Sequence, residues 1–244
     1  GNLFFHKQFT EEKSDKEFAH GYSLIYSTRN LNFNWYHQII GQGYNPADGY
    51  VPRSGYKRVS PSGAYYFYPK STLINSHGPT WDLAFIWDDI YGYTDHEIVG
   101  GYAITFQSQA ILQLNLKNTY TFLFSDFDPT NSPAVDNPVK LPAGTDYNYS
   151  NFSLSYVSEP RKPLNFQIIT YLGEYYNGIR KGITGIVTYR FQPYGIFSLD
   201  MSVNRIRLPQ LYKSADIYLV GPRLDLTLTR SVFFTTFFQY NSQY

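Results

Sequence analysis

Cysteine, charged side chains and long apolar runs are scarce or missing in this chain of 244 residues. Without cysteine the chain forms no disulfide, and its composition is compatible with an oxidising periplasm or cell surface. Only 16% of the residues are charged. A soluble domain carries roughly a quarter, so the surface of this protein needs fewer charges. No stretch approaches ~18 consecutive apolar residues, which excludes a transmembrane helix and leaves strands as the means of crossing a membrane.

The net charge is also small, at +1, and it predicts no strong attraction to nucleic acid. The chain opens at Gly1 without a basic and apolar leader, so we expect a mature form or a piece of a longer protein. Aromatic residues, in contrast, are abundant, with 25 tyrosines and 19 phenylalanines. Aromatic girdles at the two water interfaces of a membrane barrel are one use for such side chains.

An alternation of apolar and polar side chains with a period of two residues runs through the chain. Between Leu112 and Phe124 most even positions are apolar and most odd positions are polar. The same alternation returns at 152–156, 183–191, 197–204 and 223–228. Because side chains alternate across a strand, each strand then has one apolar and one polar face. A membrane-spanning barrel suits such strands, since lipid covers one face, water the other, and ~9 to 11 residues cross the hydrocarbon layer.

Alternation and turn residues together predict about a dozen strands, with boundaries uncertain by ~2 to 4 residues. They lie at 18–28, 31–41, 59–68, 81–91, 96–107, 109–124, 149–158, 164–177, 183–191, 196–207, 216–229 and 232–242.

The joins between these strands alternate in length, as outer-membrane barrels show with their short periplasmic turns and longer outside loops. Short joins are predicted at 29–30, 108, 159–163, 192–195 and 230, and longer ones at 42–58, 125–148, 178–182 and 208–215. The segment 70–80 is long where a short join is expected, which indicates a periplasmic excursion or a misplaced strand. Pro222 falls inside a predicted strand and indicates a bulge or a local break in pairing.

Several ordered strings resemble the C-terminal barrel region of large outer-membrane proteins of the Bacteroidota. They are Gly49–Tyr56, Asn75–Pro79, Phe124–Thr130, Leu141–Tyr147 and Arg190–Gly195. The resemblance runs from about Gln42 to about Asn241. Proteins of that kind carry a family-9-like carbohydrate-binding module in front of a barrel domain of uncharacterised function. That module is missing here, so the resemblance does not imply sugar binding.

The resemblance also bears on the extent of the barrel. Similar proteins continue past the region that matches Phe233–Phe237, whereas this chain stops at Tyr244. We therefore expect residues 1–244 to form one all-β domain, an antiparallel transmembrane β-barrel of the outer membrane that is an incomplete part of a larger wall. The alternative is that Tyr244, a terminal aromatic, is an assembly signal for the last strand.

Few residues carry a pattern for metal binding or catalysis. Asp126, Asp128 and Asn131 place three oxygen-bearing side chains in the predicted extracellular loop 125–148, which makes them weak calcium candidates. Turn formation explains the same residue types and is the favoured interpretation. The histidines are scattered, so no zinc site is predicted. An outer-membrane phospholipase needs a serine and a histidine on adjacent strands. His37 lies near serine and asparagine residues, but this match is no more than a coincidence. We therefore expect no enzyme.

Charged residues at polar positions of the strands form the more useful set. We predict that they face the lumen: Lys117, Arg190, Asp200, Arg223 and Asp225. Charges of both signs inside a barrel tune permeation or form sealed salt bridges, and the sequence leaves both open. We expect residues 43–60, which include Arg53, to form a loop that either folds inward as a partial plug or lies outside as a flap.

Three functions follow as hypotheses. The first is a porin- or transporter-like channel for small solutes in the outer membrane of a Gram-negative bacterium. The second is a non-transporting structural subunit that assembles with other outer-membrane or surface proteins. The third and weakest is a soluble carbohydrate-binding sandwich, whose strands are usually ~5 to 6 residues, about half the predicted length. Outer-membrane lipid is the expected partner of the first two.

Overall fold

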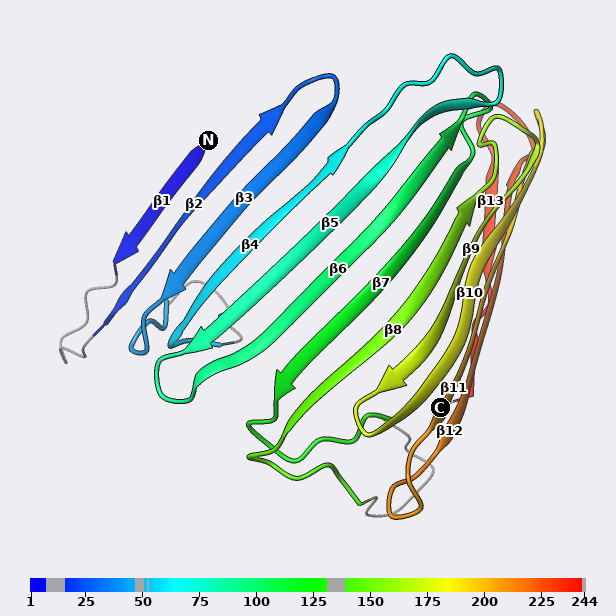
Figure 1. Ribbon diagram of the computed structural model, residues 1–244. Coiled ribbons are helices and arrows are strands. Elements are labelled where there is room, and N and C mark those ends of the chain that lie inside the picture. Colours follow the sequence, from blue (N-terminus) through cyan, green and yellow to red (C-terminus); the bar gives the residue numbers. More distant parts are fainter. Residues whose placement is uncertain (8–15, 47–50, 52, 131–138, 243–244) are drawn as a thin grey trace.

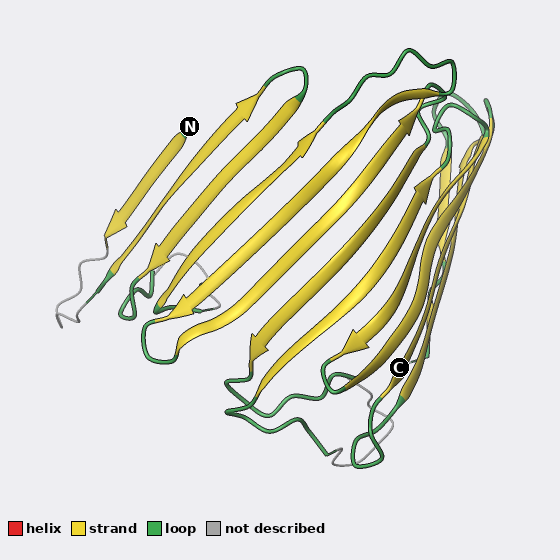
Figure 2. Cartoon of the chain, in the orientation of Figure 1, coloured by secondary structure: helices red, strands yellow, loops and turns green. Residues whose placement is uncertain are grey.

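The computed structural model describes residues 1–7, 16–46, 51, 53–130 and 139–242. All of its regular structure is β, and the described residues contain no helix (Figure 2). The fourteen strands are β1 (Asn2–Lys7), β2 (Phe18–Ser27), β3 (Leu31–Ile40), β4 (Tyr56–Tyr65), β5 (Ile74–Asp88), β6 (Gly92–Phe106), β7 (Ile111–Phe122), β8 (Asp146–Val157), β9 (Leu164–Tyr175), β10 (Gly178–Phe191), β11 (Gly195–Arg207), β12 (Ala215–Thr227), β13 (Phe233–Phe237) and β14 (Tyr240–Asn241).

The strands form one antiparallel sheet in which β1 to β13 follow each other in chain order. Strand β14 also pairs with β12, next to β13. The sheet is curved, so that β2 to β7 face the viewer in Figure 1 while β9 to β13 are seen almost edge-on. It is open among the described residues, with β1 at one edge and β13 at the other. The all-β antiparallel part of the prediction is therefore confirmed. The described strands build no second sheet, as a sandwich would require.

Strand pairing divides the side chains into two faces. Leu114 pairs with Tyr102 and Leu154, whereas the next residue, Asn115, pairs with Gly101 and Ser153. Directly paired residues point to the same side of a sheet, so this division passes from strand to strand. We call the side of Leu114 the apolar face and the side of Asn115 the polar face.

The joins also differ between the two ends of the sheet, as Figure 1 shows. At one end, here called the turn end, the joins are residues 28–30, 66–73, 107–110, 158–163, 192–194 and 228–232. At the other, the loop end, they are residues 8–17, 41–55, 89–91, 123–145, 176–177 and 208–214. The two longest joins, 41–55 and 123–145, thus lie at the same end. Strand β4 begins at Tyr56, so the predicted plug segment 43–60 includes five strand residues.

Strand β5 begins at Ile74, seven residues before the predicted start. The turn-forming pair Gly78–Pro79 concealed this part of the strand, yet Pro79 pairs with Tyr102. Gly78 is needed there because a Cβ atom would lie 1.8 Å from the carbonyl oxygen of Tyr65. The segment 70–80 is therefore not an excursion. It was expected to be a long join because the start of β5 was predicted too late in the chain. Strand β1 was not predicted at all.

The long join predicted at 178–182 is wrong, because β10 already begins at Gly178. Tyr176 and Asn177 alone connect β9 to β10, and Tyr176 has a positive φ of 51°, as tight hairpins require. A bulky residue such as Tyr176 is unusual in such a turn, which makes the turn hard to predict from the sequence.

Of the bulge or local break expected at Pro222, a break is present on one side of β12 only, because Pro222 keeps its pairing with Leu199 of β11. Pairing with β12 is interrupted between β13 and β14, although Arg223–Phe237 and Val220–Tyr240 keep one register. Proline has no backbone N–H, so only its carbonyl takes part, accepting from the amide of Phe238 at 3.1 Å.

Candidate functional site on the polar face

The five charged residues predicted to face the lumen share one face. The register of strand pairing places all five on the polar face, the side of Asn115. For example, Lys117 pairs with Asn151 and Asp200 pairs with Gly221. The same holds for Arg190, Arg223 and Asp225. They do not form a single site, because Arg190 lies at the turn end and donates to the carbonyl oxygen of Pro160 at 2.8 Å.

Charges on the polar face are largely paired with each other. Lys117 Nζ lies 2.7 Å from Glu97 Oε2, and Arg223 Nε lies 2.8 Å from Asp225 Oδ2. Asp225 also accepts a hydrogen bond from Thr235 at 2.9 Å. This face therefore carries neutralised ion pairs, with no strong excess of charge of one sign at these positions.

A hollow of about 230 Å³ lies on the polar face over β6 to β10. Arg180 closes one side, with its guanidinium 5.5 Å from the ring centres of both Tyr171 and Tyr175 and 2.7 Å from Asn204 Oδ1. The Lys117–Glu97 pair closes another side. Aromatic rings beside hydrogen-bonding groups suit a small polar solute with apolar faces. Sequence reasoning missed Arg180, because it fell in the join wrongly predicted at 178–182.

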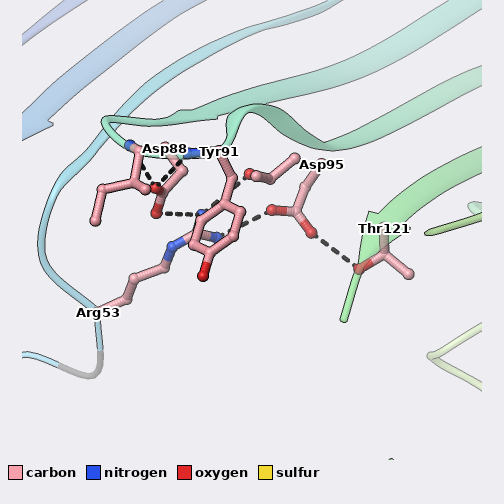
Figure 3. Close-up of polar contacts among 7 residues, drawn as sticks. Arg53, Asp88, Tyr91, Asp95 and Thr121 are labelled. Carbon is pink, nitrogen blue, oxygen red and sulfur yellow. Dashed lines mark hydrogen bonds and ion pairs between the residues drawn. The ribbon is translucent and has the colours of Figure 1, made fainter. Parts of the chain in front are cut away.

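Arg53 fastens the 41–55 join to the loop end of the sheet (Figure 3). Its Nη2 lies 3.2 Å from Asp88 Oδ2 and 3.0 Å from Thr94 Oγ1, and its Nη1 lies 3.0 Å from Asp95 Oδ2. Asp95 in turn accepts from Thr121 Oγ1 at 2.9 Å. The partners of Arg53 itself lie on β5 and β6, and Asp95 extends the network to Thr121 on β7. The sequence reading noted Arg53 only as a member of the segment 43–60.

The carboxylate of Asp88 is held on its other oxygen as well. Its Oδ1 accepts from the amides of Ile90 at 2.8 Å and Tyr91 at 3.1 Å, in the turn between β5 and β6. The guanidinium of Arg53 also lies 4.5 Å from the ring centre of Phe124, at the start of the 123–145 join. The two longest joins of the loop end therefore meet at Arg53.

The described part of the 123–145 join packs against tyrosines of the loop end. Phe127 and Leu141 form a β-bridge, and Leu141 is fully buried. The ring of Phe127 lies 5.3 Å from that of Tyr176, and the hydroxyl of Tyr175 donates to the carbonyl oxygen of Pro129 at 3.5 Å. Burial raises the pKa of the Tyr176 phenol above its usual range. The long loop is thus folded against the sheet where it is described.

The calcium candidates are engaged in local hydrogen bonds. Asp128 Oδ1 accepts from the amide of Thr130 at 2.8 Å, and Asp126 Oδ1 accepts from the amide of Ala143 at 2.9 Å. Asn131 lies outside the described residues. Within the described ranges, no three His, Asp or Glu side chains are grouped as metal ligands. His37 lies on the apolar face, where its Nδ1 accepts from Trp35 Nε1 at 3.4 Å.

The described part of the chain contains no helix with the length and hydropathy to cross a membrane. Comparison of the chain with known protein families, with curated proteins and with solved structures found no match.

Proposed function

We propose that the protein is an integral β-barrel protein of a Gram-negative outer membrane and that small solutes pass along its polar face, as in a porin or transporter. The observation that carries this proposal is the exposure of large apolar side chains along one whole face. Leu116 is 63% exposed, Leu172 52% and Ile183 47%. A soluble monomer rarely exposes a contiguous apolar patch of more than a few hundred Å², whereas lipid gives such a face a favourable environment.

The height of the apolar face agrees with a bilayer. On β9 the apolar-face positions run from Leu164 to Leu172 and are interrupted only by Thr170. Eight steps of ~3.4 Å make about 27 Å along the strand. At a tilt of about 40° this corresponds to ~21 Å along the membrane normal, close to the ~25 Å apolar band of outer-membrane barrels.

The polar face supports passage of small polar solutes. Its ion pairs, Lys117–Glu97 and Arg223–Asp225, combine with the hollow beside Arg180 to give a lining of both signs. The resemblance to Bacteroidota barrels agrees with the location, and outer-membrane lipid is the expected partner. We propose no enzymatic activity and no nucleic-acid partner.

A non-transporting structural subunit is the second candidate, and the loop end favours it. Arg53 and the 123–145 join are packed against the sheet there, which narrows the route along the polar face. Conductance across a planar bilayer separates the two candidates. Stepped, solute-dependent conductance supports the channel, whereas a silent protein that copurifies with stoichiometric partners supports the subunit.

The assignment of faces is tested with two neighbouring substitutions. Leu114→Arg places a charge on the apolar face and should cost ~2 to 4 kcal/mol near the midplane, which impairs assembly into vesicles. Asn115→Arg places the same charge on the polar face, opposite Gly101, and should be tolerated. If both variants assemble equally well, the apolar face does not contact lipid and the proposed function is wrong.

A further inference from the structure

One row of paired residues crosses the apolar face and changes from apolar to basic along its course. Each member pairs directly with the next, so all lie side by side on one face. The row begins on β6 and ends on β12: Gly100, Leu116, Phe152, Leu172, Lys181, Arg205 and Asp216.

The row also approaches the loop end as it crosses the sheet. Gly100 lies eight residues from Gly92, the loop end of β6. Lys181 lies only three residues from Gly178, and Arg205 two residues from Arg207. Gly100, Leu116 and Phe152 are therefore at mid-height, and Leu172 lies three residues from Tyr175, the loop end of β9. The basic members are near the border of the apolar face, where a membrane-embedded strand meets the headgroups.

The apolar part of the row is hollowed out around Gly100. A Cβ atom at Gly100 would meet nothing within 4 Å, and the hollow of about 540 Å³ is lined by Ile98, Leu116, Phe152 and Leu172. Trp81, which pairs with Gly100, does not fill it. A Cβ atom at Gly63 would lie 2.4 Å from Cζ2 of Trp81, so the indole ring lies over Gly63 instead. The hollow is wide enough for part of an acyl chain.

The basic part of the row places two cations opposite each other. Lys181 on β10 pairs with Arg205 on β11, and both side chains are exposed. Like charges directly opposite on a sheet are destabilising. Neither has an ion-pair partner among the described residues. The nearby Asp216 is 2.7 Å from Arg207, and Glu174 accepts from the amide of Ser150 at 2.9 Å. The cluster Lys181, Arg205, Arg207 and Asp216 therefore keeps a net positive charge.

We infer that this row binds a phosphate-bearing lipid of the surrounding leaflet, with the phosphate between Lys181 and Arg205 and an acyl chain in the hollow around Gly100. A guanidinium and an ammonium suit a phosphate, which accepts hydrogen bonds from both and removes their mutual repulsion. Leu172, which lines the hollow, pairs with Lys181, so headgroup and chain sites are contiguous. This assignment depends on the proposed function, because lipid surrounds this face only in a membrane protein.

The test uses the full chain in mild detergent, with phosphatidylglycerol titrated in and bound lipid counted by native mass spectrometry. In the double variant Lys181→Gln with Arg205→Gln, the affinity for the most tightly bound phosphatidylglycerol molecule should fall by about tenfold or more. A matched control, Lys57→Gln with Arg58→Gln, removes the same charge at the loop end of β4 and should change affinity by less than about twofold. Gly100→Leu fills the hollow and should also weaken lipid binding.

Two results would overturn the inference. One is equal retention of phosphatidylglycerol by the double variant and the wild type. The other is that soluble glycerol phosphate displaces bound phosphatidylglycerol as effectively as added phosphatidylglycerol does. The hollow would then contribute nothing to the affinity for the lipid. Insertion into vesicles of pure phosphatidylcholine is measured in parallel. Insertion without a preference for phosphatidylglycerol refutes the lipid site alone, whereas failure to insert refutes the proposed function.

Discussion

Replacement of Arg53 by glutamine should loosen the loop end of the sheet. Arg53 pairs with two carboxylates, at 3.2 Å to Asp88 and 3.0 Å to Asp95, and its guanidinium lies over the ring of Phe124. Glutamine keeps a hydrogen-bonding group but removes the charge. Both carboxylates then remain in a partly buried site without their cation, and the 41–55 join loses its ion pairs to β5 and β6.

The magnitude follows from the burial of the partners. The Arg53 side chain is 28% exposed and Asp88 12%, so the pairs lie between the surface and buried cases. About 1 kcal/mol for each ion pair and a further ~0.5 to 1 kcal/mol for the contact with Phe124 are reasonable values. The sum, ~2.5 to 3 kcal/mol, corresponds to a roughly 70- to 160-fold change in the equilibrium between attached and detached states.

Hydrogen exchange of the protein in detergent measures this change. The amide of Asp89 donates to the carbonyl oxygen of Gly55, and the amides of Ile90 and Tyr91 donate to Asp88, so peptides over 88–92 report the attachment. Their protection should fall by up to the factor given above. Arg58→Gln is the control, because the Nε of Arg58 donates to Ser60 of the same strand. Unchanged protection in Arg53→Gln, or an equal loss in Arg58→Gln, would refute the reasoning.

Two further predictions concern the sheet and its hairpin. Gly78→Ala should impair assembly, since the new Cβ would lie 1.8 Å from the carbonyl oxygen of Tyr65, whereas Gly100→Ala points into open space and should assemble normally. Gel mobility with and without heating measures this, and equal assembly of both variants would contradict it. Because the pKa of Tyr176 is raised by burial, the free energy of unfolding should fall as pH rises above about 10, where the unfolded phenol ionises, and stay unaffected below that pH. Urea unfolding at pH 8 and 11 should show a smaller loss in Tyr176→Phe, and an identical loss in both proteins would be evidence against the buried phenol.

Much of the fold is local in origin and was predictable. Alternation over Leu112 to Phe122 needs only the geometry of one strand, so the apolar and polar sides of β7 could be assigned without its neighbours. The five charged residues from Lys117 to Asp225 were assigned to one face for the same reason, and the register places them there. The break at Pro222 was predictable because proline lacks the N–H that a sheet requires.

The sequence by itself therefore determined the class of the fold and which side chains share a face, because both depend on the two-residue period of a strand. Only the tertiary structure decided which residues meet. The partners of Arg53 lie 35 and 42 residues away, and Lys181 faces Arg205 through a register set by a distant turn. Gly78 shows the same limit, since nothing in the local sequence reveals the close approach of the Tyr65 carbonyl oxygen that requires a glycine there. Such contacts depend on register and on the curvature of the whole sheet, which no short segment contains.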